Sequence, residues 1–330
     1  MCCLLCLAPK SYAAKWRAHR KGSLTTKIGV IQPELQLGLK PESGNAPPHE
    51  YHPAPSKWSF LSFDYANFGA SLSSKTANTL QEDVKYGSSQ ATDFQVRFFG
   101  KRVSHEYYYQ NYKGYYLQNT IDVVPNYDTT TPLLQQPNLT MEAEGMNVLF
   151  NFNSDNYNLG AAFNQSARQT ESGGAWLAMA SLNRIRMTNS DSFVMGTAIG
   201  QYPGFEDIRA MNIYTAKFGL GGGYTAVWRD LYASILAVLS AGQQKAYVDT
   251  VGQTTEEMNQ SNGGLHAKIG LGYNSESFLV GLRYNMDNNN FRIQKTNLSL
   301  NTGEFQVHLG WRFHEMGWTW VDDFSAWLFD

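Results

Sequence analysis

Apolar and polar residues alternate with a period of two in several segments of the chain. From Glu304 to Phe313, every odd-numbered residue is aromatic or aliphatic, while the even-numbered residues are Glu, Gln, His, Gly and Arg. The same alternation runs through Leu265–Asn274, Ser277–Met286 and Tyr157–Asn164. Successive side chains of a β-strand point to opposite faces, so this pattern predicts strands with one apolar and one polar face.

Period-two segments and the turn residues between them predict about 14 strands. The pattern is least regular in 25–38, 67–75 and 193–200, and about 12 strands are expected if two of these are lost. Several segments reach about ten residues, which crosses a bilayer at a tilt, whereas strands of soluble proteins average about five or six. The full set covers 25–38, 56–65, 67–75, 91–100, 103–117, 141–152, 157–168, 174–187, 193–200, 212–226, 231–246, 262–273, 277–286 and 303–313.

The connections between these strands sort into two classes. In bacterial barrels both termini lie in the periplasm, so short periplasmic turns should alternate with longer external loops. The expected periplasmic turns are all short and lie near 65–67, 100–102, 154–156, 188–192, 229–230 and 274–276. The expected external connections, all long and polar except 169–173, are 39–55, 76–90, 118–140, 169–173, 201–211, 247–261 and 287–302. This alternation favours an all-β fold, a single antiparallel transmembrane β-barrel over residues 25–313 with both ends in the periplasm.

Composition separates a membrane barrel from a soluble β-sandwich, whose strands would also alternate. Charged residues make up 16% of the chain and aromatics 14%, whereas typical soluble domains are about 25% charged. The longest apolar run, Leu231–Leu239, is interrupted by Ser234, and a transmembrane helix would need about 18 consecutive apolar residues. The polar strand faces mix Gly, Asn and Arg, as the inside of a barrel would. We therefore expect a β-barrel in a bacterial outer membrane, with a soluble β-sandwich as the alternative.

Both ends of the chain differ from the segments between them. Residues 1–20 start with a short apolar stretch followed by small residues, and they hold all three cysteines, Cys2, Cys3 and Cys6. This is typical of a secretory signal that lacks its basic start, and acylation at Cys6 is an alternative. Residues 314–330 form a tail that fits an amphipathic periplasmic segment, a further short strand or a mis-called chain end.

Several short motifs occur in a characteristic order. They are Y-x-P at Tyr51–Pro53, SFLSFDYANFGASLS at 59–73, EYYYQNYKGYY at 106–116, FGLGGGY at 218–224, Leu239–Gln243 and GWRF at 310–313. In this order the chain resembles, over residues 25 to 313, a family of bacterial outer-membrane proteins catalogued as a domain of unknown function (family 4421). The resemblance implies a Gram-negative outer-membrane barrel and supplies no catalytic residues. The chain departs from the family in its truncated-looking leader and in the tail after Phe313.

No catalytic or metal-binding motif is readable in the sequence. Gly69–Ser73 comes nearest to a G-x-S-x-G elbow but ends in Ser, and neither His105-Glu106 nor His314-Glu315 continues into H-E-x-x-H. The glycines of 218–224 lack the Lys-Ser/Thr of a phosphate loop and indicate a crowded or curved strand. We expect no catalytic residue, no metal and no cofactor. The net charge of −2 gives no indication of a nucleic-acid partner.

Charged residues on the predicted polar faces are the candidate lumen-lining residues. An Arg or Lys facing lipid at mid-bilayer costs about 2–4 kcal/mol, so inward placement is expected. The candidates are Arg97, Arg184, Lys217, His266, Lys268, Arg283, His308 and Arg312. Basic residues outnumber acidic ones on these faces, which favours a lumen that tolerates anions. A His266–His308 pair could bind a metal or protons, although lining histidines more often join hydrogen-bond networks.

Tyrosines cluster between Tyr107 and Tyr116. Consecutive tyrosines occupy both faces of a strand, so at least one must point into the lumen. The cluster fits an interfacial aromatic girdle, with a sugar-stacking surface as the alternative.

Three functions follow from these observations. The first is a non-enzymatic pore for small polar solutes, since a barrel of about 12–14 strands is wider than the eight-stranded kind that side chains fill. The second is a closed structural or surface-interaction barrel that presents 76–90, 118–140 and 247–261 to a partner. The third is an outer-membrane lipid-modifying enzyme. In each case the expected partners are outer-membrane lipid and the barrel-assembly machinery, the latter through the terminal strand that ends at Phe313.

Overall fold

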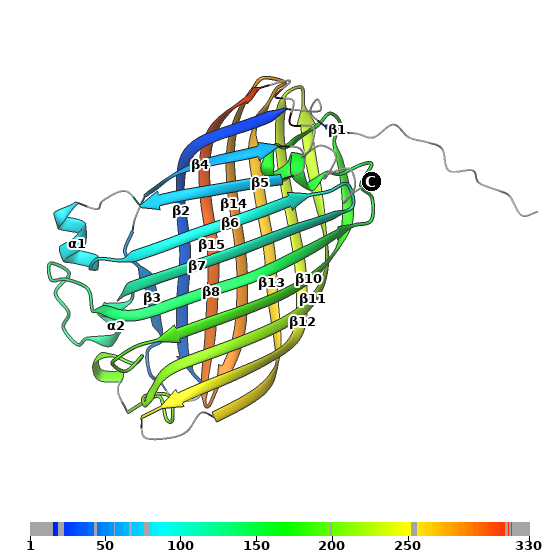
Figure 1. Cartoon of the computed structure of the whole chain (residues 1–330). Coiled ribbons are helices and arrows are strands. Elements are labelled where there is room, and N and C mark those ends of the chain that lie inside the picture. Colours follow the sequence, from blue (N-terminus) through cyan, green and yellow to red (C-terminus); the bar gives the residue numbers. More distant parts are fainter. Residues whose placement is uncertain are drawn as a thin grey trace, which may run out of the picture.

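An antiparallel sheet of 13 strands closes on itself to form a barrel in the computed structural model (Figure 1). The structure describes residues 16–18, 23–42, 45–55, 57–65, 68–75, 79–198, 200–251, 256–313, 316 and 318. Apart from 16–18, 316 and 318, the expected signal segment 1–20 and tail 314–330 therefore lie outside the described residues. The ring closes where β15 (Thr296–Phe313) pairs with β2 (Leu24–Pro41) along the full length of both strands. The expected single β-barrel is confirmed.

The strands that complete the ring are long and follow one another in chain order. They are β4 (Trp58–Tyr65), β5 (Phe68–Lys75), β6 (Gln90–Phe99), β7 (Val103–Leu117), β8 (Gln135–Asn151), β10 (Gly173–Thr188), β11 (Ile208–Trp228), β12 (Leu231–Thr250), β13 (Glu256–Asn274) and β14 (Phe278–Ile293), with the short β3 (His49–Pro53) beside β2. A two-stranded sheet of β1 (Trp16–Ala18) and β9 (Ala167–Gln169) lies apart from the ring.

The barrel contains fewer strands at one end than at the other. At the end of Leu24, β2 pairs with β4, and β4 is followed around the ring by β5, β6 and β7. At the opposite end β3 pairs with both β2 and β7. The strands β4, β5 and β6 therefore occupy only one end of the wall, and above them β3 alone spans the gap between β2 and β7.

The two ends also differ in their connections. Short turns join β4 to β5, β6 to β7, β11 to β12 and β13 to β14 at the end where β2 begins and β15 ends. This is the periplasmic end, because barrel strands are joined there by short turns. The opposite, extracellular end carries the helices α1 (Leu80–Tyr86) and α2 (Thr120–Val123) (Figure 1).

A band of exposed apolar side chains surrounds the periplasmic half of the wall. On β12 the outward positions run from Leu231 through Ile235 to Ala241, and Gln243, Lys245, Tyr247 and Asp249 follow. About ten residues at roughly 3.3 Å each, tilted by about 40°, cover about 25 Å, which is the height of the apolar band of outer-membrane barrels. We call this band the lipid belt.

Above the lipid belt the direction of the apolar face is reversed. On β15 the apolar residues from Phe305 to Phe313 point outward, whereas Leu298 and Leu300, nearer the extracellular end, are buried inside. On β2 Ile28 and Val30 point outward, and Leu35 to Leu39 point inward. The strands are therefore mainly polar inside and apolar outside where lipid surrounds them, and the reverse where water does.

This reversal explains why two expected loops are strands. We expected external loops at 247–261 and 287–302 because both segments are polar. β12 and β13 instead extend to Thr250 and from Glu256, and β14 and β15 meet at a turn between Ile293 and Thr296. Polar side chains such as Asn290, Arg292 and Asn297 are on the outer face, above the membrane.

Two expected strands, 157–168 and 193–200, are wrong. The first lies between β8 and β10 and forms a π-helical turn, η1 (Gly160–Asn164), followed by β9. The second lies between β10 and β11 and contains a 3-10 turn, η2 (Gly196–Ala198). The connection expected as a periplasmic turn at 188–192 accordingly lies at the extracellular end, and the short external connection at 169–173 does not exist. Because the two wrong strands lie on either side of the correctly predicted strand 174–187, their effects cancel, and the side assigned to every other connection was still correct.

Among the described residues, no helix has the length and apolar character needed to cross a membrane.

Candidate functional site: the filled lumen

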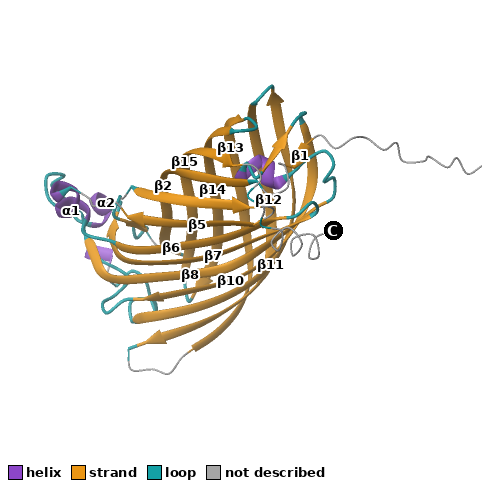
Figure 2. Ribbon diagram, turned by 45° about the horizontal axis from the view of Figure 1, so that its top comes forward, coloured by secondary structure: helices purple, strands orange, loops and turns teal. Residues whose placement is uncertain are grey.

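The connection between β8 and β10 folds into the periplasmic end of the barrel. All residues from Tyr157 to Gln165 are buried, and Tyr157 and Phe163 pack with Leu177 and Val238 of the wall. Figure 2 shows the helical turn of this segment at the barrel end opposite α1 and α2. We call residues 157–165 the periplasmic plug.

Charged wall residues hold the periplasmic plug through its backbone and its amides. Lys27 donates to the backbone carbonyl of Asn164 at 2.5 Å and forms a 2.7 Å ion pair with Asp64, which accepts a hydrogen bond from the Asn164 amide at 2.7 Å. Arg312 donates to the Gln165 carbonyl at 2.7 Å, and the Nε2 of His308 lies 2.7 Å from the Gln165 Oε1. These contacts satisfy backbone groups that would otherwise be buried without partners.

A layer of ion pairs occupies the middle of the lumen. Glu304 lies between Arg283, with which it forms a short ion pair, and Arg97, whose Nη2 is 3.6 Å away. Gln95 donates to Glu304 at 2.6 Å. The three charged side chains are at most 11% exposed, so each charge depends on its partner.

A second group of paired polar side chains lies beside the first. The Lys268 ammonium group contacts both carboxylate oxygens of Glu106, and the Nδ1 of His266 lies 2.8 Å from Asp287. Lys217 donates to Asn289. The Lys268–Glu106 ion pair and the His266–Asp287 contact border a cavity of about 70 Å³ that Tyr108 also lines. It has room for only a few water molecules.

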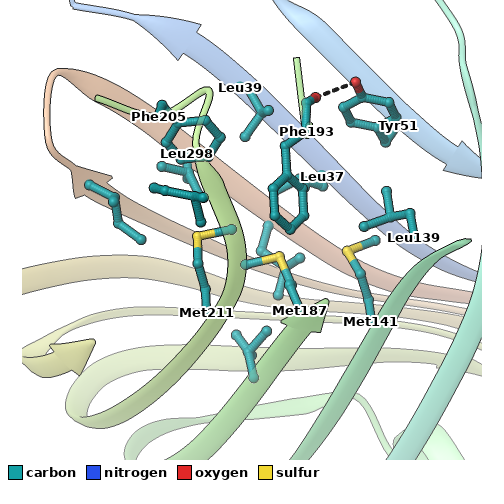
Figure 3. Close-up of a cluster of buried hydrophobic side chains, with 14 of the residues drawn as sticks. Leu37, Leu39, Tyr51, Leu139, Met141, Met187, Phe193, Phe205, Met211 and Leu298 are labelled. Carbon is teal, nitrogen blue, oxygen red and sulfur yellow. Dashed lines mark hydrogen bonds between the residues drawn. The ribbon is translucent and has the colours of Figure 1, made fainter. Parts of the chain in front are cut away.

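The extracellular end of the lumen is filled by an apolar core (Figure 3). The connection 189–207 between β10 and β11 folds inward and buries Phe193, Tyr202 and Phe205 completely. Met141, Met187, Met211 and Val248 are adjacent in register on four neighbouring strands and pack beneath it. We call residues 189–207 the extracellular plug.

Polar contacts fix the extracellular plug to β3. The Tyr51 hydroxyl donates to the Phe193 carbonyl at 2.5 Å. The Nε2 of His49 lies 3.0 Å from the Met195 backbone nitrogen and 3.1 Å from the Met195 carbonyl oxygen, and its Nδ1 lies 3.2 Å from the Tyr202 hydroxyl. Burial lowers the pKa of His49 below its ordinary value of 6.5, so the imidazole is neutral at pH 7.

Seven of the eight candidate lumen residues point inward. Arg97, Lys217, His266, Lys268, Arg283, His308 and Arg312 are all in the interior described above. Arg184 is on the outer wall instead, directly above the lipid belt, where it pairs with Glu144 at 3.1 Å and contacts the Tyr214 ring. Arg184 and Leu182 lie on the same outer face of β10. Leu182 faces lipid, whereas Arg184 lies above the lipid belt and faces water, so the outer face changes here from apolar to polar.

The proposed histidine pair is not formed. His266 pairs with Asp287, and His308 contacts the periplasmic plug and Gln306. Among the residues that the structure describes, no three His, Cys, Asp or Glu side chains come together as a metal site would require.

Sequence reasoning missed most of the acidic partners and both plugs. Asp64, Glu106 and Asp287 each pair with a basic lumen residue, so the excess of basic charge that favoured an anion-tolerant lumen is largely neutralised. Glu106 and Asp287 alternate in phase with inward residues of their strands, and this signal could have identified them. The plug contacts join residues more than 100 positions apart, and no local pattern encodes them.

The tyrosine cluster is divided between the two faces of β7, as expected. Tyr112 and Tyr115 are buried inside, and the Tyr108 hydroxyl donates to Asn183 at 2.9 Å. Tyr107 is 42% exposed on the outer face, at the upper edge of the lipid belt. This arrangement is that of an interfacial girdle combined with lumen packing.

A model of the family DUF4421, described as a domain of unknown function, matches residues 15–313. The chain belongs to this family. No curated protein matches the DUF4421 chain. Among solved structures it is similar to the outer membrane protease OmpT of Escherichia coli, with 7% identity, a TM-score of 0.40 and coverage of 90% of this chain and 98% of that one. It is also similar to the attachment invasion locus protein Ail of Yersinia pestis, with 11% identity, a TM-score of 0.23 and coverage of 89% and 100%.

A third similar structure is the monoaromatic hydrocarbon channel CymD, with 6% identity, a TM-score of 0.29 and coverage of 90% of both chains. The three differ in role, and none of these roles transfers to the DUF4421 chain. With its closed ring of strands and its lipid belt, the DUF4421 chain is a transmembrane β-barrel of the bacterial outer membrane.

Proposed function

We propose that this protein is a closed, non-enzymatic barrel that acts at the cell surface through its extracellular end. The observation that carries the proposal is the filling of the lumen at both ends, by the periplasmic plug and by the extracellular plug. Between them lies the layer of ion pairs, with its cavity of about 70 Å³. This favours the closed barrel over the pore for small polar solutes that the strand count alone suggested.

The extracellular rim supports a surface role. α1 buries none of its residues, and Leu80 and Val84, one turn apart, are 86% and 65% exposed. The helix is nevertheless fixed, because Thr79 and Glu82 form a capping box and the Leu133 N–H donates to the Lys85 carbonyl at 3.0 Å. An apolar ridge held in place at the rim is typical of a contact surface for a partner.

Recording from planar bilayers tests whether the lumen is closed. We expect no conductance steps from the purified protein, nor from a variant in which a short turn replaces 153–171 or one in which a short loop replaces 190–206. The variant carrying both replacements should conduct, because only the ion-pair layer then remains. Steady conductance of the unaltered protein would refute the closed barrel.

A complementation experiment tests the surface role separately. In a strain that lacks the protein, a variant with a Gly-Ser linker in place of 79–87 should fail to restore envelope integrity, measured as detergent resistance. Lengthening the periplasmic turn at Arg229–Asp230 by two glycines is the matched control and should restore it. Full restoration by both variants would contradict a role for α1.

Assembly in the membrane is part of the same proposal. β15 ends at Phe313, which is 51% exposed and pairs with Leu24 at the seam of the barrel. We propose that the barrel-assembly machinery recognises this terminal strand.

A further inference from the structure

A polar groove of about 870 Å³ lies on the outer wall above the lipid belt. Its floor is formed by the outer faces of β3, β2, β15 and β14, which are adjacent in the sheet. Its position on the outside separates it from the lumen and from the rim helices, so a ligand bound there would not need an open pore.

Small residues and a local splitting of the sheet create the hollow. Gly38 and Ser299 are paired across β2 and β15, and Ser299 is paired with Asn290 of β14. Pairing between β13 and β14 ends at Gly263 and Asn290, while β13 continues beside β12. Residues 260 and 261 of β13 therefore stand at the edge of the groove as a side wall, with Gln260 donating to the Arg292 carbonyl.

The side chains that line the groove are mainly amides and hydroxyls. Gln36, Asn290, Asn297, Asn301 and Ser299 all face it. Primary amides offer donors and an acceptor side by side, which matches the vicinal hydroxyls of a sugar ring. A phosphate or sulfate would require unpaired cations instead.

The charges in the groove are balanced. Arg292 pairs with Glu42 at 2.6 Å, and the groove also contains one further base, Lys40, and one acid, Glu50. Burial lowers the pKa of His52 below 6.5, so this side chain is neutral at pH 7. The groove is therefore a nearly neutral hydrogen-bonding surface.

Its height places the groove beside the headgroups of the outer leaflet. Phe305 is the last outward apolar residue of β15, and Asn301 and Asn297 lie four and eight positions beyond it. At roughly 3.3 Å per residue and a tilt of about 40°, this corresponds to about 10–20 Å above the edge of the hydrocarbon. The groove opens sideways, toward neighbouring lipids.

We propose that this groove binds the uncharged sugar residues in the headgroup of a neighbouring outer-leaflet glycolipid. The inference goes beyond the proposed function and does not depend on whether the lumen is closed. Amide side chains recognise the ring hydroxyls, the small residues Gly38 and Ser299 leave space for the sugar ring, and the lipid belt below holds the acyl chains of the same molecule.

Glycolipid retention by purified protein tests this inference. The unaltered barrel is reconstituted in phosphatidylethanolamine vesicles that contain lipopolysaccharide, extracted in mild detergent, and assayed for bound sugar. Ser299→Trp, which fills the floor, and the double variant Asn297→Ala, Asn301→Ala should each retain about five- to ten-fold less, as expected for losing one or two hydrogen bonds or the space for a ring. Thr140→Trp, an outward site above the belt on β8, is the matched control and should retain the normal amount.

Heat-modifiable migration on gels confirms that each variant is folded, and the two groove variants act by different means, so a folding defect in one leaves the other informative. Equal retention by all variants overturns the inference. A second result would also overturn it: the lipid-free oligosaccharide released from the same lipopolysaccharide binds as tightly as the intact lipid, and Ser299→Trp abolishes that binding. The ligand would then be a soluble saccharide. Conductance is not expected to change in any of these variants, which keeps this result separate from the test of the closed lumen.

Discussion

Glu304 is the residue on which the middle of the lumen depends. It faces both Arg283 and Arg97 and also accepts from Gln95. Two buried guanidinium groups close to one another are tolerable only because the carboxylate lies between them. Glu144 on the outer wall has a single arginine partner, and both members of that pair are about one third exposed.

Removing these two carboxylates should have very different costs. We expect Glu304→Ala to lower the free energy of unfolding by about 3–5 kcal/mol, because it leaves buried charges uncompensated. Glu144→Ala should cost about 0–1 kcal/mol, the usual range for an exposed pair. Guanidinium unfolding of the barrel in lipid vesicles, followed by tryptophan fluorescence, measures both. Equal losses would show that the ion pairs of the lumen are solvated.

Inward glycines provide the space for the periplasmic plug. A Cβ at Gly223 would lie 2.5–2.8 Å from the Tyr157 side chain, and a Cβ at Gly270 would lie 2.5 Å from the Ala162 carbonyl oxygen. The glycine-rich segment 218–224, which the sequence indicated only as a crowded strand, is thus crowded by a specific neighbour.

We therefore expect Gly270→Val to displace the periplasmic plug. Limited proteolysis from the periplasmic side should then cut between 153 and 172 at least about ten-fold faster, since exposure of a docked segment controls its cleavage. Gly222→Val is the control, because Gly222 faces lipid and its Cβ would meet nothing closer than 3.3 Å. Unchanged cleavage in Gly270→Val would mean that the wall adjusts and the plug stays in place.

At the scale of elements, alternation of apolar and polar residues identifies the strand segments within the lipid belt. Above the belt the same pattern gives wrong strand ends. The twelve strands from 25–38 to 303–313, without 157–168 and 193–200, were predicted correctly, even where, as in 67–75, the pattern is weak. β3 was missed because five residues between Pro48 and Ala54 give too short a pattern. The ends of β12 to β15 were read as loops because their alternation reverses phase where water replaces lipid.

The two plugs show a different limit of sequence reading. Residues 157–164 alternate as a strand would, yet they form a π-helical turn, because their apolar side chains can be buried inside a barrel that the remaining strands have already closed. Seven of the eight residues predicted to line the lumen nonetheless point inward, since a charge within the belt is costly on the lipid side. Arg184 was wrong because it lies beyond the belt, where this constraint ends.

The docking of the extracellular plug should depend on pH through His49. β3 lies above the lipid belt, and docking buries the His49 ring against the Met195 backbone, with Nε2 3.0 Å from the nitrogen and 3.1 Å from the carbonyl oxygen. Because burial lowers the pKa of docked His49 below 6.5, the undocked state takes up a proton as pH falls below 6.5 and the docked state resists it. Docking should therefore weaken by up to about ten-fold per pH unit below 6.5, until the pKa of the docked state is reached.

Thiol labelling follows this equilibrium. The variant carries Val194→Cys, and Cys2, Cys3 and Cys6 are replaced by Ser so that a single thiol remains. The labelling rate of this thiol, normalised to denatured protein at each pH, should rise as the pH is lowered from 7 to 5. His49→Gln, which cannot be protonated, should remove the pH dependence. A rise that persists in His49→Gln would assign the effect to another group.

At the scale of the whole molecule, the same wall is surrounded by lipid in its lower part and by water in its upper part. Its lower part has the polar interior of a membrane barrel, and its upper part, with fewer strands around it, has the apolar core of a soluble protein. The narrowing at β3 brings the wall close enough for Tyr51 to reach the Phe193 carbonyl. A shape that tapers toward the extracellular side is what allows one loop to fill that end.

The edge of the lipid belt can be located by arginine substitutions at two outward positions of β12. Ala237→Arg places a charge near mid-belt and should lower the free energy of unfolding from the membrane by about 2–4 kcal/mol. Gln243→Arg should cost only about 0–1 kcal/mol. Gln243 is the first outward residue beyond Ala241, the last apolar one, so a long side chain there can reach water. Equilibrium refolding into lipid vesicles measures both variants against the unaltered barrel.

The two costs together locate the edge of the belt on β12. If the lipid belt ended lower on the wall, Ala237→Arg would cost no more than Gln243→Arg. If it ended higher, both substitutions would be expensive, and the reversal of phase on β12 could not mark the change from lipid to water.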